Sequence, residues 1–149
     1  MKTAAEIRPA TSADIPVVLE LIHALARYEK LDHLVQADAA LLEKELFSGK
    51  GPAETLLCSV AGDAVGFAVY FHNFSTFMGR KGLYLEDLFV RPEHRGRGYG
   101  KALFLHVARI AHQRGCGRFE WMVLDWNAPS IRFYESHGAQ RMDEWGLFR

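Results

Sequence analysis

The segment Arg95–Lys101 holds the residues whose types and spacing most clearly indicate chemistry. It combines three glycines with three cationic side chains in seven residues. Glycine permits positive φ angles and lets the backbone come close to a ligand. Arginine and lysine form charge-assisted hydrogen bonds to oxyanions. This combination predicts a cradle for a phosphate group. The alternative is a tight strand-to-helix turn whose arginines are solvated and hold no ligand.

The elements expected on either side of this segment favour the phosphate cradle. An apolar, strand-like run, Leu83–Val90, comes before it, and an amphipathic, helix-like run, Lys101–Arg114, follows. The N-terminus of a helix presents unpaired N–H groups and a partial positive charge to an anion. The spacing matches neither GxxxxGK[ST] nor GxGxxG, so a P-loop or a dinucleotide site is not expected.

The composition is that of one soluble globular domain over residues 1–149, with 49% hydrophobic and 24% charged residues. Eighteen basic and eighteen acidic residues cancel, so no overall field attracts nucleic acid or an anionic membrane. The N-terminal residues 1–6 contain no apolar leader, and no apolar run approaches the length of a membrane span. We therefore expect a cytoplasmic protein without a nucleic-acid or membrane partner.

The histidines and cysteines do not indicate a metal site. Cys58 and Cys116 lie far apart, in apolar surroundings and without zinc-ligand spacing. Both are expected to be reduced thiols. His106 and His112 fall on different faces of the expected helix. No metal cofactor is predicted.

The hydrophobic pattern predicts a mixed sheet with helices, in the α/β or α+β class. The segment 118–124 is expected to be a buried central strand, 73–82 a loop, and the last two strands an antiparallel pair that closes the sheet. The expected strands cover 7–10, 55–61, 64–71, 83–90, 118–124, 139–142 and 145–148, and the expected helices cover 11–29, 38–48, 101–114 and 127–137.

The residues Arg95-Gly96-Arg97-Gly98-Tyr99-Gly100 match the [Q/R]-x-x-G-x-[G/A] signature for the pyrophosphate of acyl-CoA. On this signature and the order of elements, the chain resembles the GNAT N-acetyltransferases. The resemblance implies a mostly antiparallel sheet that is splayed at the acetyl-CoA site and flanked by about four helices. It also implies acetyl-CoA as the cosubstrate.

Within that family, the chain most resembles the diamine (spermidine/spermine) and thialysine acetyltransferases. The resemblance implies acetyl transfer to a primary amine of a small diamine, polyamine or thialysine-like substrate, in a homodimer. The stretches that carry it span nearly the whole chain: Ile7-Arg8-Pro9-Ala10-Thr11, Leu25-Ala26-Arg27-Tyr28-Glu29, Leu83-Tyr84-Leu85-Glu86-Asp87-Leu88-Phe89-Val90, Trp126-Asn127-Ala128-Pro129-Ser130-Ile131 and Phe133-Tyr134-Glu135-Ser136-His137-Gly138-Ala139.

The resemblance also implies which residues bind the donor. Backbone groups of Leu88 and Val90 are expected to contact the acetyl and pantetheine portion. Backbone amides of the cradle, in Gly96–Lys101, are expected to hold the pyrophosphate. Asn127 is expected to bind pantetheine through its amide, although its type equally fits a helix N-cap. The predicted donor-binding residues are Leu88, Phe89, Val90, Arg95, Gly96, Arg97, Gly98, Tyr99, Gly100, Lys101, Asn127, Ser130 and Tyr134.

Two residues are predicted to move protons. A lysine-like amine has a pKa of about 10.4, so only about one molecule in a few thousand is nucleophilic at pH 7. Glu86 is the predicted base, acting directly or through water, because desolvation in an apolar strand would raise its pKa. Tyr134 is, by resemblance, the acid that protonates the departing thiolate. The alternatives are an ion pair for Glu86 and a core position for Tyr134.

Predicted acceptor contacts are Tyr28, Glu29, Glu86, Asp87 and Glu144, with Asp143 competing for the last place. Glu29 could pair with a distal ammonium, or could be a solvated helix end. Asp87 points away from Glu86 if the strand is regular, and a bulge would change this. Two other functions stay open: a protein N-terminal or lysine acetyltransferase, and a non-catalytic acyl-CoA-binding module.

Overall fold

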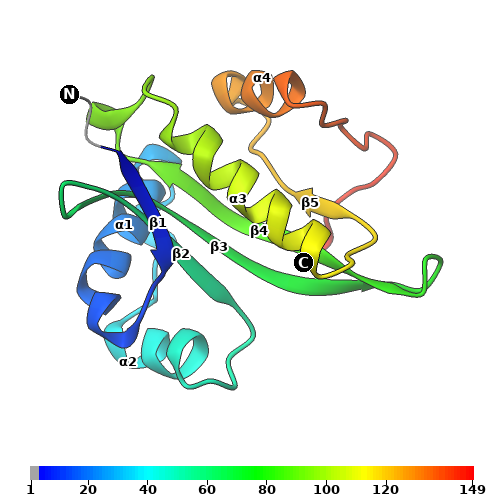
Figure 1. Ribbon diagram of the computed structural model, residues 1–149. Coiled ribbons are helices and arrows are strands. Elements are labelled where there is room, and N and C mark those ends of the chain that lie inside the picture. Colours follow the sequence, from blue (N-terminus) through cyan, green and yellow to red (C-terminus); the bar gives the residue numbers. More distant parts are fainter. Residues whose placement is uncertain (1–3) are drawn as a thin grey trace.

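The computed structural model describes residues 4–149 and shows a sheet covered by helices on both faces (Figure 1). Helices α1 (Ile15–Tyr28) and α2 (Ala39–Leu42) pack on one face. Helices α3 (Tyr99–Gln113) and α4 (Ala128–Ser136) lie on the other. Residues 1–3, part of the stretch that predicts the lack of a leader, lie outside the described residues.

The five strands found in residues 4–149 follow one another in the sheet in the order of the sequence. Neighbours are antiparallel except for the last two strands, which run parallel. This mixed, mostly antiparallel sheet with four helices confirms the predicted fold class. The strands are β1 (Ala5–Pro9), β2 (Glu54–Val60), β3 (Asp63–Ser75), β4 (Arg80–Val90) and β5 (Phe119–Trp121).

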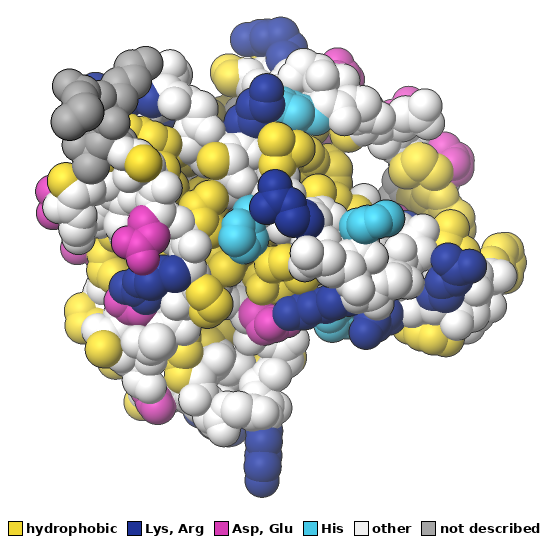
Figure 2. Space-filling model, viewed as in Figure 1, with side chains coloured by type: hydrophobic (Ala, Val, Ile, Leu, Met, Phe, Trp, Pro, Cys, Tyr) yellow, Lys and Arg dark blue, Asp and Glu magenta, His cyan; other side chains and the backbone are white. Residues whose placement is uncertain are grey.

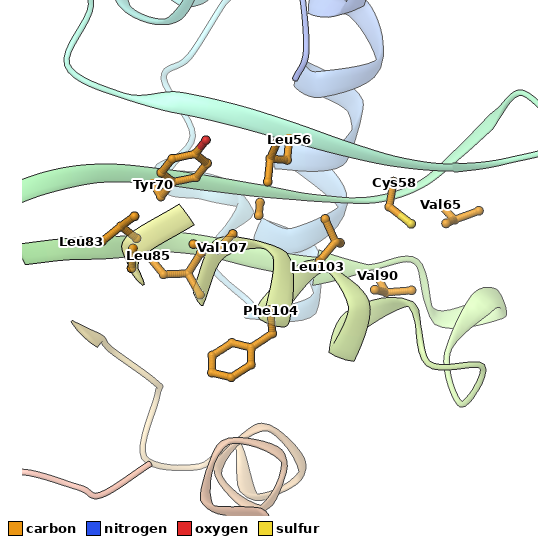
Figure 3. Packing of buried hydrophobic residues seen from close by; sticks show 12 residues of the cluster. Leu56, Cys58, Val65, Tyr70, Leu83, Leu85, Val90, Leu103, Phe104 and Val107 are labelled. Atoms are coloured by element: carbon orange, nitrogen blue, oxygen red, sulfur yellow. The ribbon is translucent and has the colours of Figure 1, made fainter. Parts of the chain in front are cut away.

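Alternation along the strands divides the core between the two faces, because successive side chains point to opposite sides. In β2, Leu57 faces α1 and α2, whereas Leu56 faces α3. Leu103 and Val107 of α3 point to the sheet, and Phe104 points away from it toward α4 (Figure 3). Phe104 therefore connects the α3 layer with the helix that carries Tyr134.

The short 3-10 turn Ser12–Asp14, which leads into α1, follows the local sequence. A capping box joins Thr11 and Asp14, in which the Thr11 N–H donates to the Asp14 carboxylate at 2.8 Å. Arg8 holds the same carboxylate at 2.7 Å, which keeps the pKa of Asp14 below its usual range. The second expected helix is found, but after Leu42 it continues as a π-helical segment, Glu43–Phe47.

The expected loop over 73–82 is wrong, because strands β3 and β4 continue to Ser75 and from Arg80 as a projecting hairpin (Figure 1). The register pairs Asn73 with Gly82. The segment after α3 supports the extension, since Gly117 N–H donates to the Lys81 carbonyl at 2.9 Å. A contact between segments so far apart leaves no local sequence signal.

The expected strand over 118–124 is also wrong in length and place. β5 has three residues, pairs on one side with β4 and forms an edge of the sheet. The expected closing strands, 139–142 and 145–148, are absent from the described chain. Trp145 and Phe148 are 76% and 95% exposed, so the burial that would stabilise such strands is missing.

Eighteen basic and eighteen acidic residues give the chain a formal net charge of zero. On the face in Figure 2, lysine and arginine lie among histidine, acidic and apolar side chains. Cys58 and Cys116 are free thiols, as expected. No helix in residues 4–149 is long and apolar enough to cross a membrane. The same residues contain no cluster of three potential metal ligands.

Candidate active site

A cavity of about 420 Å³ lies where four parts of the chain meet. These are the end of α1, the second half of β4 with the turn after it, the start of α3, and the β5–α4 segment. Strand β5 pairs with β4 only at Leu83–Leu85, and beyond that point no described strand continues on this side. The sheet is therefore open at the cavity, as the resemblance implies.

Nearly all of the predicted site residues line this one cavity. They come from segments up to about a hundred residues apart in the chain, so the sequence-based grouping is spatially coherent. The predicted residues in the lining are Tyr28, Glu29, Glu86, Asp87, Leu88, Phe89, Val90, Arg95, Gly96, Gly98, Tyr99, Gly100, Lys101, Asn127, Ser130 and Tyr134.

The turn into α3 has the geometry of an anion cradle. Gly96 and Gly98 adopt φ angles of 75° and 88°, and Gly98 is the N-cap of α3. A Cβ at either position would meet nothing within 4 Å, so glycine is required by backbone conformation and not by lack of space. The first amide groups of α3 remain free for a ligand because they have no intrahelical partner. Arg97 is exposed and is outside the cavity lining.

The Arg95 side chain lies against the rings of Tyr28 and Phe89. Its Nε donates to the Val90 carbonyl at 2.9 Å. Its guanidinium carbon lies 4.4 Å from the ring centroid of Tyr28 and 5.4 Å from that of Phe89. Stacking and the hydrogen bond together fix the turn against the end of α1.

A bulge in β4 decides how its two carboxylates lie. Asp87 pairs with Val69 and Leu85 with Tyr70, so Glu86 is an extra residue without a partner in β3. Both acids consequently line the cavity, because a bulge interrupts the alternation. Glu86 is exposed, so the expected desolvation of this side chain is wrong. It forms no ion pair with any residue in 4–149.

Asp87 has the environment that was expected for Glu86. Although it keeps some exposed area at the cavity, protein surrounds it closely, and desolvation raises its pKa to about 7. The negative charges of Glu86 and Glu29 add to this shift. The pKa of Glu29 is raised as well, first by burial and then by Glu86. Three carboxylates therefore act on one another at one part of the cavity wall.

Tyr134 is held on α4 by an aromatic cluster. Its ring lies 4.9 Å from Trp121, 5.6 Å from Phe104 and 5.2 Å from Phe133, centroid to centroid. Burial raises the pKa of its phenol, and the charges of Asp87 and Glu29 act in the same direction. Tyr134 therefore stays protonated at neutral pH while its side chain borders the cavity.

Asn127 forms the predicted helix N-cap and also lines the cavity. It is the N-cap of α4, where its Oδ1 accepts from the Ser130 N–H at 3.4 Å. The same oxygen accepts from the Tyr28 hydroxyl at 3.1 Å. Asn127 is 6% exposed, yet it lines the cavity.

The C-terminal acids do not reach the cavity. Glu144 and Asp143 are exposed, and Asp143 pairs with Arg141 at 2.8 Å. The described chain forms no strand over 139–148, so this segment stays at the surface. Trp121 is a cavity residue that the sequence analysis missed. Its aromatic type at the end of a strand was the available signal.

The Acetyltransferase (GNAT) family model matches residues 18–139 of the chain. The chain belongs to the GNAT family. It is thus an acetyl-CoA-dependent N-acetyltransferase, and the cradle, the open sheet and Tyr134 lie within the residues that the family match covers. The expected family is confirmed.

Two curated proteins and one solved structure illustrate what this chain is similar to. A thialysine N-epsilon-acetyltransferase from Bos taurus is 38% identical over 157 residues, which cover 96% of this chain and 90% of that protein. An L-ornithine N5-acetyltransferase from Arabidopsis thaliana is 33% identical, covering 96% and 82% of the two chains. A solved integron cassette protein from the mobile metagenome of V. cholerae has a TM-score of 0.80, with 29% identity over 97% and 91% of the chains.

Proposed function

We propose that this GNAT enzyme transfers the acetyl group of acetyl-CoA to a primary amine of a small diamine, polyamine or thialysine-like acceptor. One observation carries the proposal: Glu29, Glu86 and Asp87 border the same cavity as the anion cradle and Tyr134. Carboxylates on the acceptor side suit a substrate with more than one positive charge. The names of the bovine and Arabidopsis relatives point to the same substrate class.

The reaction is proposed to be a direct attack of the amine on the thioester. Asp87 accepts the amine proton, because its pKa of about 7 suits a base at neutral pH. Tyr134 donates a proton to the departing thiolate. Glu86 and Glu29 hold the cationic acceptor. This assigns to Asp87 the role that the sequence suggested for Glu86, since Glu86 is exposed.

The donor is proposed to bind through backbone groups on one side of the cavity. The amides at the start of α3, in Gly98–Lys101, suit the pyrophosphate. The edge of β4 at Leu88–Val90 can pair with the pantetheine arm, since no described strand occupies it. The Val90 carbonyl already accepts from Arg95, so the other edge groups of this segment are the ones available. Asn127 and Ser130 line the same cavity and are proposed to complete the channel.

An acceptor panel tests the proposed function. We expect turnover of α,ω-diamines, L-ornithine and thialysine, and little turnover of monoamines of equal length. Glu29→Gln should raise KM for diamines about fivefold, the effect of losing an ion pair worth about 1 kcal/mol, and leave KM for monoamines unchanged. Glu45→Gln, at an exposed position, is the matched control. Turnover of N-terminal or lysine peptides but not of diamines would reject the proposed substrate class.

We also propose that the enzyme is a homodimer. The resemblance to the diamine enzymes supports this, as do large apolar side chains exposed at the β3–β4 hairpin. Phe74 is 61% exposed, Phe77 is 102% exposed and Met78 is 52% exposed. Such a patch is typical of an interaction surface. Light scattering after gel filtration should give twice the chain mass of 16.9 kDa. A mass of one chain at micromolar concentration would exclude the dimer.

A further inference from the structure

The Tyr28 hydroxyl is committed to a contact that joins two distant parts of the cavity wall. It donates to Asn127 Oδ1 at 3.1 Å, across 99 positions of the sequence. Tyr28 ends α1, and Asn127 begins α4. The bond therefore ties the first helix to the segment that is proposed to contact pantetheine.

Two donors on one oxygen determine how the Asn127 amide is oriented. Oδ1 accepts from both Tyr28 and the Ser130 N–H. The amide's other end, Nδ2, carries two N–H donors and has no hydrogen-bond partner in residues 4–149. Because Asn127 is buried but lines the cavity, these donors are available to a ligand there. If the Asn127 amide were rotated by half a turn, Oδ1 would take the place of Nδ2 and would offer the ligand an acceptor in place of two donors.

The surroundings of the Tyr28 ring point to the donor side as well. Arg95 of the cradle lies 4.4 Å above the ring, and the rings of Trp126 and Phe89 lie 6.0 Å and 6.4 Å away. Each of these neighbours belongs to the cradle, to β4 or to the β5–α4 segment. Tyr28 is thus the common contact of the elements that enclose the proposed CoA channel.

We propose that Tyr28 is a positioning residue for the acyl donor: its hydroxyl fixes the Asn127 amide so that the Nδ2 donors face a carbonyl of the pantetheine arm. This departs from the sequence-based prediction that Tyr28 contacts the amine acceptor. The proposed role of Tyr28 rests on the proposed function in one respect, which is that acyl-CoA occupies the cavity. The identity of the acceptor does not enter.

Calorimetric titration of Tyr28→Phe tests this inference without turnover. The variant keeps the ring beneath Arg95 and removes one hydrogen bond. We expect the Kd for CoA to rise about five- to tenfold, the usual effect of losing one such bond. The Kd for adenosine 3′,5′-bisphosphate, which lacks pantetheine, should stay unchanged. Tyr84→Phe is the matched control, because Tyr84 lies outside the cavity lining.

A double-mutant cycle adds a second measurement. Asn127→Ala should weaken CoA binding, and adding Tyr28→Phe to it should weaken binding by less than twofold more, since the two residues act through one bond. Thermal melts identify variants that fail to fold. Unchanged CoA affinity in Tyr28→Phe, or an effect confined to the acceptor KM, overturns the inference. Failure of the unmodified enzyme to bind CoA would overturn the proposed function as well.

Discussion

Replacing Tyr134 with phenylalanine is expected to lower kcat by about two to four orders of magnitude, the usual contribution of a general acid. The departing CoA thiolate would then take its proton from water. The phenol suits this task because burial and two nearby carboxylates keep it protonated. Phenylalanine preserves the ring contacts with Trp121 and Phe104 that hold α4 in place.

Steady-state kinetics and CoA titration together separate the acid role from a packing role. We expect the Kd for CoA to change by less than about threefold, since only a hydroxyl is removed. Tyr84→Phe, which removes a hydroxyl outside the cavity, should keep full activity. If Tyr134→Phe turned over at the rate of the unmodified enzyme, Tyr134 would be a core residue and another group would supply the proton.

Asp87→Asn is the second substitution with a large expected effect. An amide cannot accept the amine proton, so kcat/KM should fall by about two orders of magnitude or more. Glu86→Gln should raise KM for the acceptor and lower kcat by less. The reverse order of effects would return the role of base to Glu86.

The pH dependence provides an independent test of Asp87. Its pKa of about 7 predicts that kcat/KM rises with pH through about 7, as the carboxyl loses its proton. The acceptor amine titrates near 10.4, so its own limb lies at much higher pH. The limb near 7 should disappear in Asp87→Asn. A profile without this limb in the unmodified enzyme would contradict the assignment.

The same shift affects stability in a known direction. In the unfolded chain the Asp87 carboxyl has its ordinary pKa of 3.8, and in the folded chain about 7. The folded state therefore binds more protons between these values, and its stability falls as pH rises through this window. Asp87→Asn removes this loss of stability at high pH. The melting temperature of the variant should therefore exceed that of the unmodified enzyme by more at pH 8 than at pH 4.

Much of the fold was predictable because it depends on local signals. Thr11 and Asp14 mark the start of α1, and the glycines of 96–100 mark the turn before α3. The long β3–β4 hairpin was not predictable, because Gly117 and its neighbours support it from a distant segment. The absent C-terminal strands were overpredicted from alternation alone, without a partner strand to pair with.

The site residues were predictable as a set, but their individual environments were not. The resemblance identified Glu86 and Asp87, but only the bulge opposite Val69 shows which of the two is desolvated. Sequence likewise suggested Tyr28 and Asn127 for different ligands. Their hydrogen bond joins positions too far apart for any local pattern to reveal.

The opening of the sheet beyond Leu85 has an evolutionary consequence. On the proposed function, the donor is recognised mainly by peptide groups and a helix terminus, which most side-chain substitutions leave in place. The acceptor is recognised by a few carboxylates, which single substitutions can remove or move. A lineage built on this scaffold can therefore change its amine while keeping its acetyl source. Enzymes with one donor and diverging acceptors are the expected descendants of such a division.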